Sequence, residues 1–277
     1  MLPAGKPGLF SWEYSLQTAP STTPGVALTP GTGAEGAYVE LASAANLAQD
    51  CYAIRLWVNA GNTTATIRDI LLDIGVDPAG GTSYAQTQGI SDLWVPQAAA
   101  AVSGGYFMDL PFFIKAGSSV GARAQSSAAT TVRVAAWFYG RPAHPEFLPV
   151  AQYVEALGAS GNGGTPVTCG NTAAEGAWTS IGTTTRATWA WILETGHNVG
   201  TTTAQMYFFD LAWSNDATNY WPIITNQPHH NAGTAETTGS ARRLVFADVP
   251  AGATIYVRGS ASGTAETCEA IAHGFGG

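Results

Sequence analysis

The chain has 277 residues, which is enough for one large domain or two small ones, each with a core that needs no disulfide. Only 11% of its residues are charged, against about 25% in typical soluble proteins. The net charge is −8 and no cluster of Lys or Arg is present, so we expect no nucleic acid and no anionic membrane as a partner.

The first predicted element is an extended N-terminal arm, residues 1–27. Its four prolines hold the backbone extended and cannot donate to a β-ladder, so we expect the arm to stay off its own sheets. We expect it to lie across a neighbouring subunit or a particle surface. Its apolar anchors are Leu9, Phe10, Trp12 and Tyr14. No secretory signal and no run of roughly 18 apolar residues is present, so we expect synthesis in a cytoplasm and release only by lysis.

Residues 28–140 are predicted to form a first β-sandwich domain. Apolar side chains recur at every second position along residues 52–58, 106–114 and 132–138, and this period indicates half-buried strands. Turn-rich stretches such as residues 77–81 separate these runs. Many short strands at a spacing of about 8–12 residues are typical of a jelly-roll-like sandwich.

Residues 141–165 are predicted to be a linker, and residues 166–277 a second β-sandwich domain. The linker begins with three prolines, which stiffen it, and ends with a glycine-rich stretch at residues 158–164, which makes it flexible. Between them, residues 150–157 are expected to form one short helical turn.

An internal repeat relates the two predicted sandwiches. Four short matches recur in the same order, at offsets that drift only from 140 to 135 residues. The matched pairs are residues 34–37 and 174–177, 70–74 and 207–211, 116–117 and 251–252, and 139–140 and 275–276. The repeat predicts an all-β protein of two tandem, homologous, jelly-roll-like domains.

Two acidic pairs recur in both copies, Glu35 with Asp73 and Glu175 with Asp210. A glycosidase needs two carboxyl groups about 5–9 Å apart in a cleft. We instead expect Asp73 on the polar face of a strand and Glu35 in a turn where it bonds backbone N–H groups. Duplicated active sites seldom both persist, so we interpret the pairs as structural and assign no catalytic residue.

No other motif predicts an enzyme, a cofactor or a metal site. The chain has no nucleophile elbow, metalloprotease motif or phosphate-binding loop. His229 and His230 are expected in a loop with their side chains pointing apart, which does not suit one zinc ion. Cys169 and Cys268 could meet within the second sandwich, although buried free thiols are the favoured interpretation.

Aromatic residues give the strongest indication of a ligand. Trp189, Trp191 and Trp213 occupy positions that are expected to face the core. Tyr220 and Trp221 lie near predicted loops, and they are the expected exposed pair on which a sugar ring would stack.

Residues 72–81 and 111–125 resemble β-sandwich structural proteins of tailed bacteriophages. An apolar residue, an Ala-Gly pair and a later Arg recur in both halves, although Gly259-Ser260 replaces Ala124-Gln125 in the second copy. The resemblance implies a non-enzymatic virion protein made in the bacterial host cytoplasm, such as a head decoration, head fibre, coat or tail component. The apolar anchors of the arm and the open sheet edges would be exposed on a monomer, so we expect a closed homo-oligomer. The resemblance to phage spikes and decorations favours a trimer in contact with other virion proteins.

Two alternative functions remain open. The first is a carbohydrate-binding adsorption protein that recognises host surface glycans, and exposed aromatics in a loop groove would support it. The second is an enzyme acting on polysaccharide.

Overall fold

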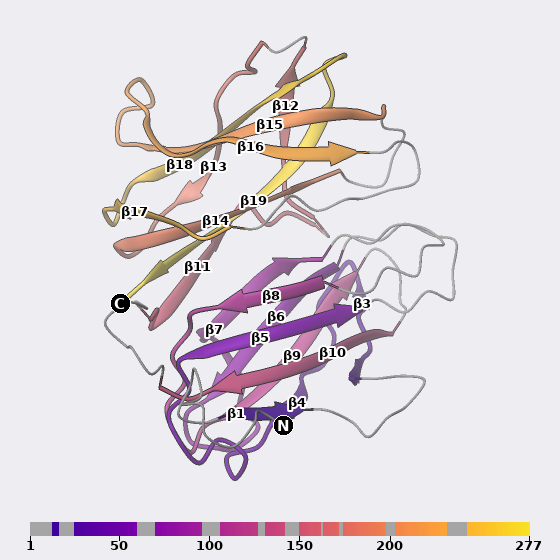
Figure 1. Ribbon diagram of the computed structural model, residues 1–277, viewed down its shortest axis with the longest axis vertical. Helices are drawn as coiled ribbons and strands as arrows, with labels where there is room; N and C mark the ends of the chain where they lie inside the picture. Colours follow the sequence, from indigo (N-terminus) through magenta and orange to yellow (C-terminus); the bar gives the residue numbers. More distant parts are fainter. Residues whose placement is uncertain are drawn as a thin grey trace, which may run out of the picture.

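The computed structural model describes residues 13–16, 25–59, 70–95, 106–126, 131–141, 150–161, 163–171, 174–197, 203–231 and 243–277. All regular secondary structure in these ranges is β-strand, which confirms the prediction of an all-β fold. No helix that is long and apolar enough to cross a membrane occurs among these residues. Figure 1 shows the strands β1 to β10 in one lobe and β11 to β19 in another, here called the first and second halves.

Two five-stranded sheets form the first half. One has the order β1-β10-β5-β8, with β2 also on β10; its strands are β1 (Glu13–Leu16), β2 (Val26–Leu28), β5 (Ala53–Asn59), β8 (Tyr106–Leu110) and β10 (Val132–Tyr139). The other has the order β3-β9-β6-β7, with β4 also on β9; its strands are β3 (Gly31–Thr32), β4 (Val39–Ala42), β6 (Ile70–Asp77), β7 (Ala85–Trp94) and β9 (Ser119–Ser126). Alternate side chains of both sheets, such as Leu56 and Ile74, meet in one buried core, so the half is a sandwich.

The strands of the second half are connected as one nine-stranded sheet. Its order is β16-β15-β18-β12-β19-β14-β17, with β11 also on β19 and β13 on β18. The strands are β11 (Tyr153–Leu157), β12 (Thr165–Gly170), β13 (Thr179–Thr183), β14 (Thr188–Gly196), β15 (Gln205–Ser214), β16 (Trp221–Asn231), β17 (Val245–Val249), β18 (Thr254–Ala261) and β19 (Thr267–Gly276). Leu193 and Leu211 meet in a second buried core.

Strand pairings of the first half recur in the second. β3 runs parallel to β9, and β12 runs parallel to β18. Asp73 lies opposite Arg123, and Asp210 lies opposite Arg258. The central strands also match, because β5 lies between β10 and β8 while β14 lies between β19 and β17. Positions that the sequence repeat aligns therefore have the same neighbours across the strands.

The described part of the predicted arm lies on its own sandwich. β1 pairs antiparallel with β10, and Tyr14 lies opposite Phe138 with their ring centroids 6.0 Å apart. The expectation that the arm stays off its own sheets is wrong for residues 13–16, and also for residues 26–27, which pair with β10 as part of β2. These residues contain no proline, so their backbone is free to extend the sheet edge. Leu9, Phe10 and Trp12 lie outside the described residues.

The predicted linker contains a strand instead of a helical turn. β11 pairs antiparallel with β19, from Tyr153 opposite Gly276 to Leu157 opposite Ala272. The aromatic and β-branched residues at its start favour a strand, and the open edge of β19 supplies the pairing groups.

The two halves pack against each other. Side chains of β14 and β19 that point away from the second core, such as Ile192 and Phe275, join the core of the first half. The backbone N–H of Trp94 donates to Glu194 Oε2 at 2.7 Å, and the Trp94 ring lies over Gly196, where a Cβ would clash with it. Figure 1 shows β11 and β14 at this boundary.

Candidate functional site

The acidic residues of the repeat are bound to an arginine in each half. In the first half, Asp73 accepts a hydrogen bond from Arg123 Nε at 2.9 Å and another from the backbone N–H of Asp92 at 2.8 Å. Glu35 completes the cluster as a second ion-pair partner of Arg123, whose guanidinium lies 4.6 Å from the centre of the Tyr38 ring.

The second half repeats this arrangement. Asp210 accepts from Arg258 Nε at 3.0 Å and from the backbone N–H of Asn226 at 2.8 Å. Glu175 pairs with Arg258, which lies 4.4 Å from the centre of the Trp178 ring. Asn226 has a φ of 49° and Asp92 has a φ of 56°, so each aspartate holds a left-handed backbone residue at a strand irregularity.

These contacts support a structural role for the four carboxylates. Asp73 faces polar partners as expected, although it is buried, and Glu35 binds the guanidinium of Arg123. Carboxylate oxygens of Glu35, Asp73 and Asp92 lie within 4.8 Å of one another, the only such metal-compatible group in the described ranges. Arg123 already supplies the positive charge there, so we assign no metal to it.

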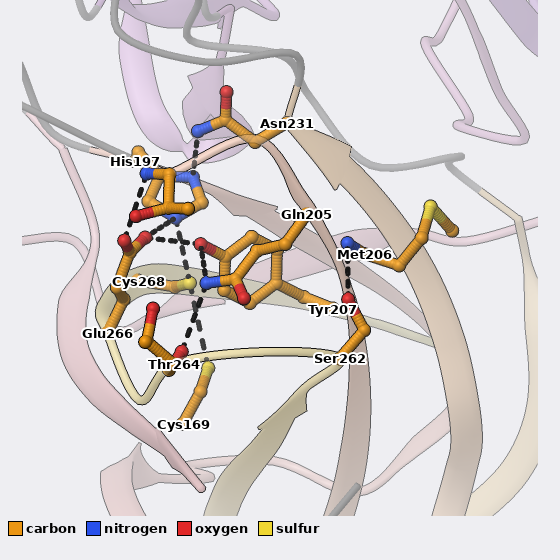
Figure 2. Close-up of polar contacts among 11 residues, drawn as sticks. Cys169, His197, Gln205, Met206, Tyr207, Asn231, Ser262, Thr264, Glu266 and Cys268 are labelled. Atoms are coloured by element: carbon orange, nitrogen blue, oxygen red, sulfur yellow. Dashed lines mark hydrogen bonds and ion pairs between the residues drawn. The ribbon is translucent and has the colours of Figure 1, made fainter. Parts of the chain in front are cut away.

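A second polar cluster lies in the second half, at one end of its core (Figure 2). Its side chains come from the ends of β12, β15, β16 and β19 and from the residues next to β14 and β19. Its members are Cys169, His197, Gln205, Tyr207, His229, Asn231, Glu266 and Cys268. Most of these side chains are fully buried, and sequence reasoning identified only the cysteines and His229.

His197 is the centre of this polar cluster. Its Nε2 atom lies 3.2 Å from Cys268 Sγ and 3.9 Å from Glu266 Oε2, while its Nδ1 atom lies 3.2 Å from the side-chain amide of Asn231. Burial lowers the pKa of His197, more than the nearby Glu266 raises it. The ring is therefore neutral near pH 7 and able to accept a proton.

Glu266 is held as a carboxylate at the edge of the cluster. It accepts hydrogen bonds from the Tyr207 hydroxyl and from the backbone N–H of Thr203. Burial alone would raise the pKa of Glu266, but hydrogen bonds from Thr203 and Tyr207 outweigh it and lower the pKa. Burial, and then the bond to Glu266, raises the pKa of Tyr207, so that hydroxyl remains a donor.

His229 lies deeper in the core. It is 1% exposed, and neither ring nitrogen has a hydrogen-bond partner among the described residues. Burial, with a smaller effect of His197, lowers the pKa of His229 to about 3. Both His229 and His230 belong to β16, so the expected loop is wrong, but their side chains do point apart, one buried and the other exposed.

The two cysteines of the cluster are close neighbours. Cys169 Sγ and Cys268 Sγ are 3.6 Å apart, and both are free, fully buried thiols. They therefore meet within the second sandwich. Burial strongly raises the pKa of Cys268, which keeps it protonated. The chemistry available to this cluster is proton exchange between thiol and imidazole, and formation of a bond between the two sulfurs.

Three of the matching positions of the first half are apolar. Ile70 corresponds to Tyr207 in the repeat. Val95 corresponds to His229, because the backbone N–H of Val95 donates to Ile70 O and His229 lies opposite Tyr207. Val132 lies opposite Leu28, where Cys268 lies opposite Val167. Ile70, Val95 and Val132 are all buried. At these three described positions the polar cluster has no counterpart in the first half, whereas the aspartate–arginine cluster occurs in both halves.

Tyr220 and Trp221, the predicted sugar platform, point to opposite sides of the chain. Tyr220 stacks on Trp178, with ring centroids 4.8 Å apart and planes 17° apart. Trp221 instead stacks on Trp213, at 5.9 Å and 26°. Adjacent residues of an extended chain point to opposite sides, so Tyr220 and Trp221 do not form one surface. Trp221 is 57% exposed.

The core assignment of the other tryptophans is correct only for Trp191. Trp191 is fully buried. Trp189 is half-buried and stacks on the exposed Phe246, with ring centroids 6.0 Å apart. Trp213, near the end of β15, packs against the second core but is half-buried.

No protein-family model and no curated protein matches the chain. Among solved structures it is similar to PNGF-II, with 9% identity, a TM-score of 0.42, and coverage of 96% of this chain and 65% of that one. It is also similar to the tandem CBM22-1-CBM22-2 domains of Paenibacillus barcinonensis Xyn10C (11% identity, TM-score 0.25, coverage 94% and 91%). A protein of Sulfolobus Turreted Icosahedral Virus matches with 8% identity, a TM-score of 0.29 and coverage of 90% of each chain. All three likenesses are too distant to assign a function.

Proposed function

We propose that this chain is a non-enzymatic structural protein of a virion, made of two tandem copies of one β-sandwich, which assembles with further copies of itself. The supporting observation is a surface that is covered in the first half and exposed in the second. Leu71 and Trp94 are cross-strand neighbours on β6 and β7, and Ile271 of the second half covers them.

The corresponding pair in the second half is Phe208 opposite Pro228, on β15 and β16. Phe208 is 38% exposed and Pro228 is exposed, whereas Leu71 is 4% exposed. Strand β16 is also an edge of its sheet, and unpaired edges with apolar side chains are sites of association. A second copy of the chain is the occupant that this surface suits, because the first half shows the same surface receiving a sandwich face.

The opposite edge strand, β17, carries another exposed aromatic side chain, Phe246, at 63% exposure. Aromatic enrichment and depletion of charge are typical of the centres of protein interfaces, and only 11% of this chain is charged. A tailed-phage particle, as a head decoration, head fibre, coat or tail component, is the setting that the sequence resemblance supports. A trimer is the proposed closed form.

Light scattering of the full chain tests this proposal. We expect a mass above that of the monomer at micromolar concentration, and a monomer for Phe208→Glu, because a charge there must be desolvated on association. Thr225→Glu places the same charge at an exposed position of β16 and should assemble like the wild type. A monomeric wild type, or equal behaviour of both variants, would contradict the assembly role.

Carbohydrate binding is the second candidate, supported by the stacked pair of Trp213 and the exposed Trp221. Such a ring presents a flat apolar face to a sugar. Glycan-array binding that Trp221→Ala abolishes and Phe246→Ala retains would favour this candidate over a purely structural role. Binding that survives Trp221→Ala would remove the assignment.

A further inference from the structure

Cys169 and Cys268 form a thiol pair whose sulfur atoms are in contact. Cys169 lies on β12 and Cys268 on β19, as diagonal neighbours two residues apart in register, because Cys268 is opposite Val167. Their Sγ atoms are 3.6 Å apart and must approach to about 2.05 Å for a disulfide. The two sulfur atoms must therefore move about 1.5 Å closer together.

The residues around the two cysteines differ from their counterparts in the first half, and the differences make room for the thiols. A Cβ at Gly259 would lie 2.5 Å from Cys169 Sγ, so glycine makes room for that sulfur. The matched residues of the first half are Pro30, Ala124 and Val132, which provide neither the thiols nor the space. The two cysteines and the glycine are therefore a combined feature of the second copy.

His197 supplies a proton acceptor for one of the two thiols. Its Nε2 atom lies 3.2 Å from Cys268 Sγ, within hydrogen-bonding reach, and it is buried with that thiol. Cys268 is a thiol at rest, so the thiolate that attacks an oxidant forms only as Cys268 gives its proton to His197 during the reaction. Cys268 is the cysteine with this proton acceptor in reach, and is therefore placed to react first. Cys169 is placed to resolve the product.

We propose that Cys169 and Cys268 form a reversible disulfide that joins β12 to β19 when the protein passes from a reducing to an oxidising environment, with hydrogen peroxide as the oxidant. This cross-link is independent of the proposed assembly. Peroxide is small enough to reach a buried sulfur during brief local opening, which a bulky disulfide oxidant is not.

The reaction has two steps. Cys268 gives its proton to His197 and attacks peroxide, which forms a sulfenic acid and releases hydroxide; that hydroxide takes the proton from His197 and becomes water. Cys169 sulfur then displaces the hydroxyl group from Cys268 Sγ, and this group leaves as a second water with the Cys169 proton. Two thiols are oxidised to one disulfide while one peroxide is reduced to two waters. A small thiol reductant reverses the reaction by exchange during the same local opening that admits peroxide.

The cross-link would stabilise the second sandwich. The two cysteines are 99 residues apart in sequence, so the disulfide closes a long loop in the unfolded chain and removes much of its conformational entropy. We expect the oxidised protein to melt about 10 °C above the reduced protein.

The experiment treats the full, reduced chain with peroxide, removes the excess, unfolds the protein and alkylates its thiols before mass spectrometry. The wild type has three cysteines, and we expect only Cys51 to be alkylated after oxidation, together with a linked peptide pair containing Cys169 and Cys268. Cys169→Ser should lose both the linked peptides and the rise in melting temperature. Cys51→Ser removes an equally buried thiol and should keep both.

Three alkylated cysteines after peroxide treatment, or a linked peptide that contains Cys51, would overturn the proposal. So would a wild type whose native mass shows a metal ion retained by the thiols, or a Cys169→Ser protein that gains the same melting temperature. If Cys169→Ser fails to fold, the peptide map of the wild type alone decides.

Discussion

The substitution Gly274→Ala tests whether both halves follow one packing plan. Gly274 lies opposite the fully buried Trp191 in the central pairing of the second half. A Cβ at this position would lie 2.8 Å from Trp191 Cη2 and 3.0 Å from Thr188 Cγ2, whereas carbon atoms pack at about 3.5–4.0 Å. The ring is enclosed and cannot move aside, so we expect the substitution to lower the free energy of unfolding by about 1–3 kcal/mol.

The first half predicts how to relieve this clash. Ile54 lies opposite Phe138 at the matched positions, so the large ring is on the other strand. Trp191→Ile alone should leave a cavity and lower stability by about 2–4 kcal/mol. In that background Gly274→Ala fills space and restricts the unfolded chain, so it should be neutral or stabilising by about 0.5 kcal/mol. The expected coupling between the two substitutions is about 2–3 kcal/mol.

Urea unfolding of the wild type, both single variants and the double variant measures this coupling. The free energies are compared through the urea concentration at the midpoint, provided that the dependence of the free energy on urea concentration is the same in all four proteins. Effects that add to within about 0.5 kcal/mol would show that Trp191 and Gly274 are not packed against each other, and that the matched registers of the two halves do not reflect matched packing.

Two further predictions concern the clusters described above. Asp73→Asn and Asp210→Asn each leave a half-buried arginine without its main partner, so each should lower unfolding stability by about 2–4 kcal/mol; unchanged thermal unfolding of either variant would exclude the structural role. His229 has a pKa lowered to about 3, against an ordinary value of 6.5, so the unfolded chain binds a proton that the folded chain excludes. Stability should therefore fall as the pH drops from about 6.5 towards 3, by up to ~1.4 kcal/mol per pH unit, and His229→Val should remove most of this slope in urea unfolding at several pH values. An unchanged slope would contradict it.

The strand content was predictable because alternation is a local signal. Residues 52–58 and 132–138 alternate as half-buried strands should, and the structure pairs them as β5 and β10. The alignment of Asp73 with Asp210 also predicted equivalent positions, because each aspartate lies opposite an arginine on the neighbouring strand. The strand β11 could not be predicted locally. Its pairing depends on an edge of β19 that lies more than 100 residues further along the chain.

The polar cluster around His197 was missed because its residues are far apart in the sequence and fit no spacing motif. One signal was present in the repeat, where Tyr207, with a polar hydroxyl, occupies the inward position of Ile70. The register that places His229 beside Tyr207 becomes visible only in the folded sheet. Tyr220 and Trp221 failed as a pair for the opposite reason, because neighbours in sequence point to different sides of an extended chain.

The contact between the two halves constrains how copies can assemble. The β14–β19 face of the second half covers the β6–β7 pair of the first, so the contact joins unlike surfaces. Repeating it between chains would place the corresponding β5–β10 face of one copy on Phe208 and Pro228 of the next. A contact between unlike surfaces closes into a ring only if its rotation divides a full turn, and otherwise it produces a filament.

Light scattering over a range of concentrations distinguishes these outcomes. A closed trimer should hold one mass, three times that of the 28.6 kDa chain, across at least a tenfold range of concentration above its dissociation constant. Open association should instead give a mass that grows with concentration, because every added subunit leaves a free Phe208 surface for the next. Such growth would refute the trimer while keeping the interface, and Phe208→Glu would then abolish the growth itself.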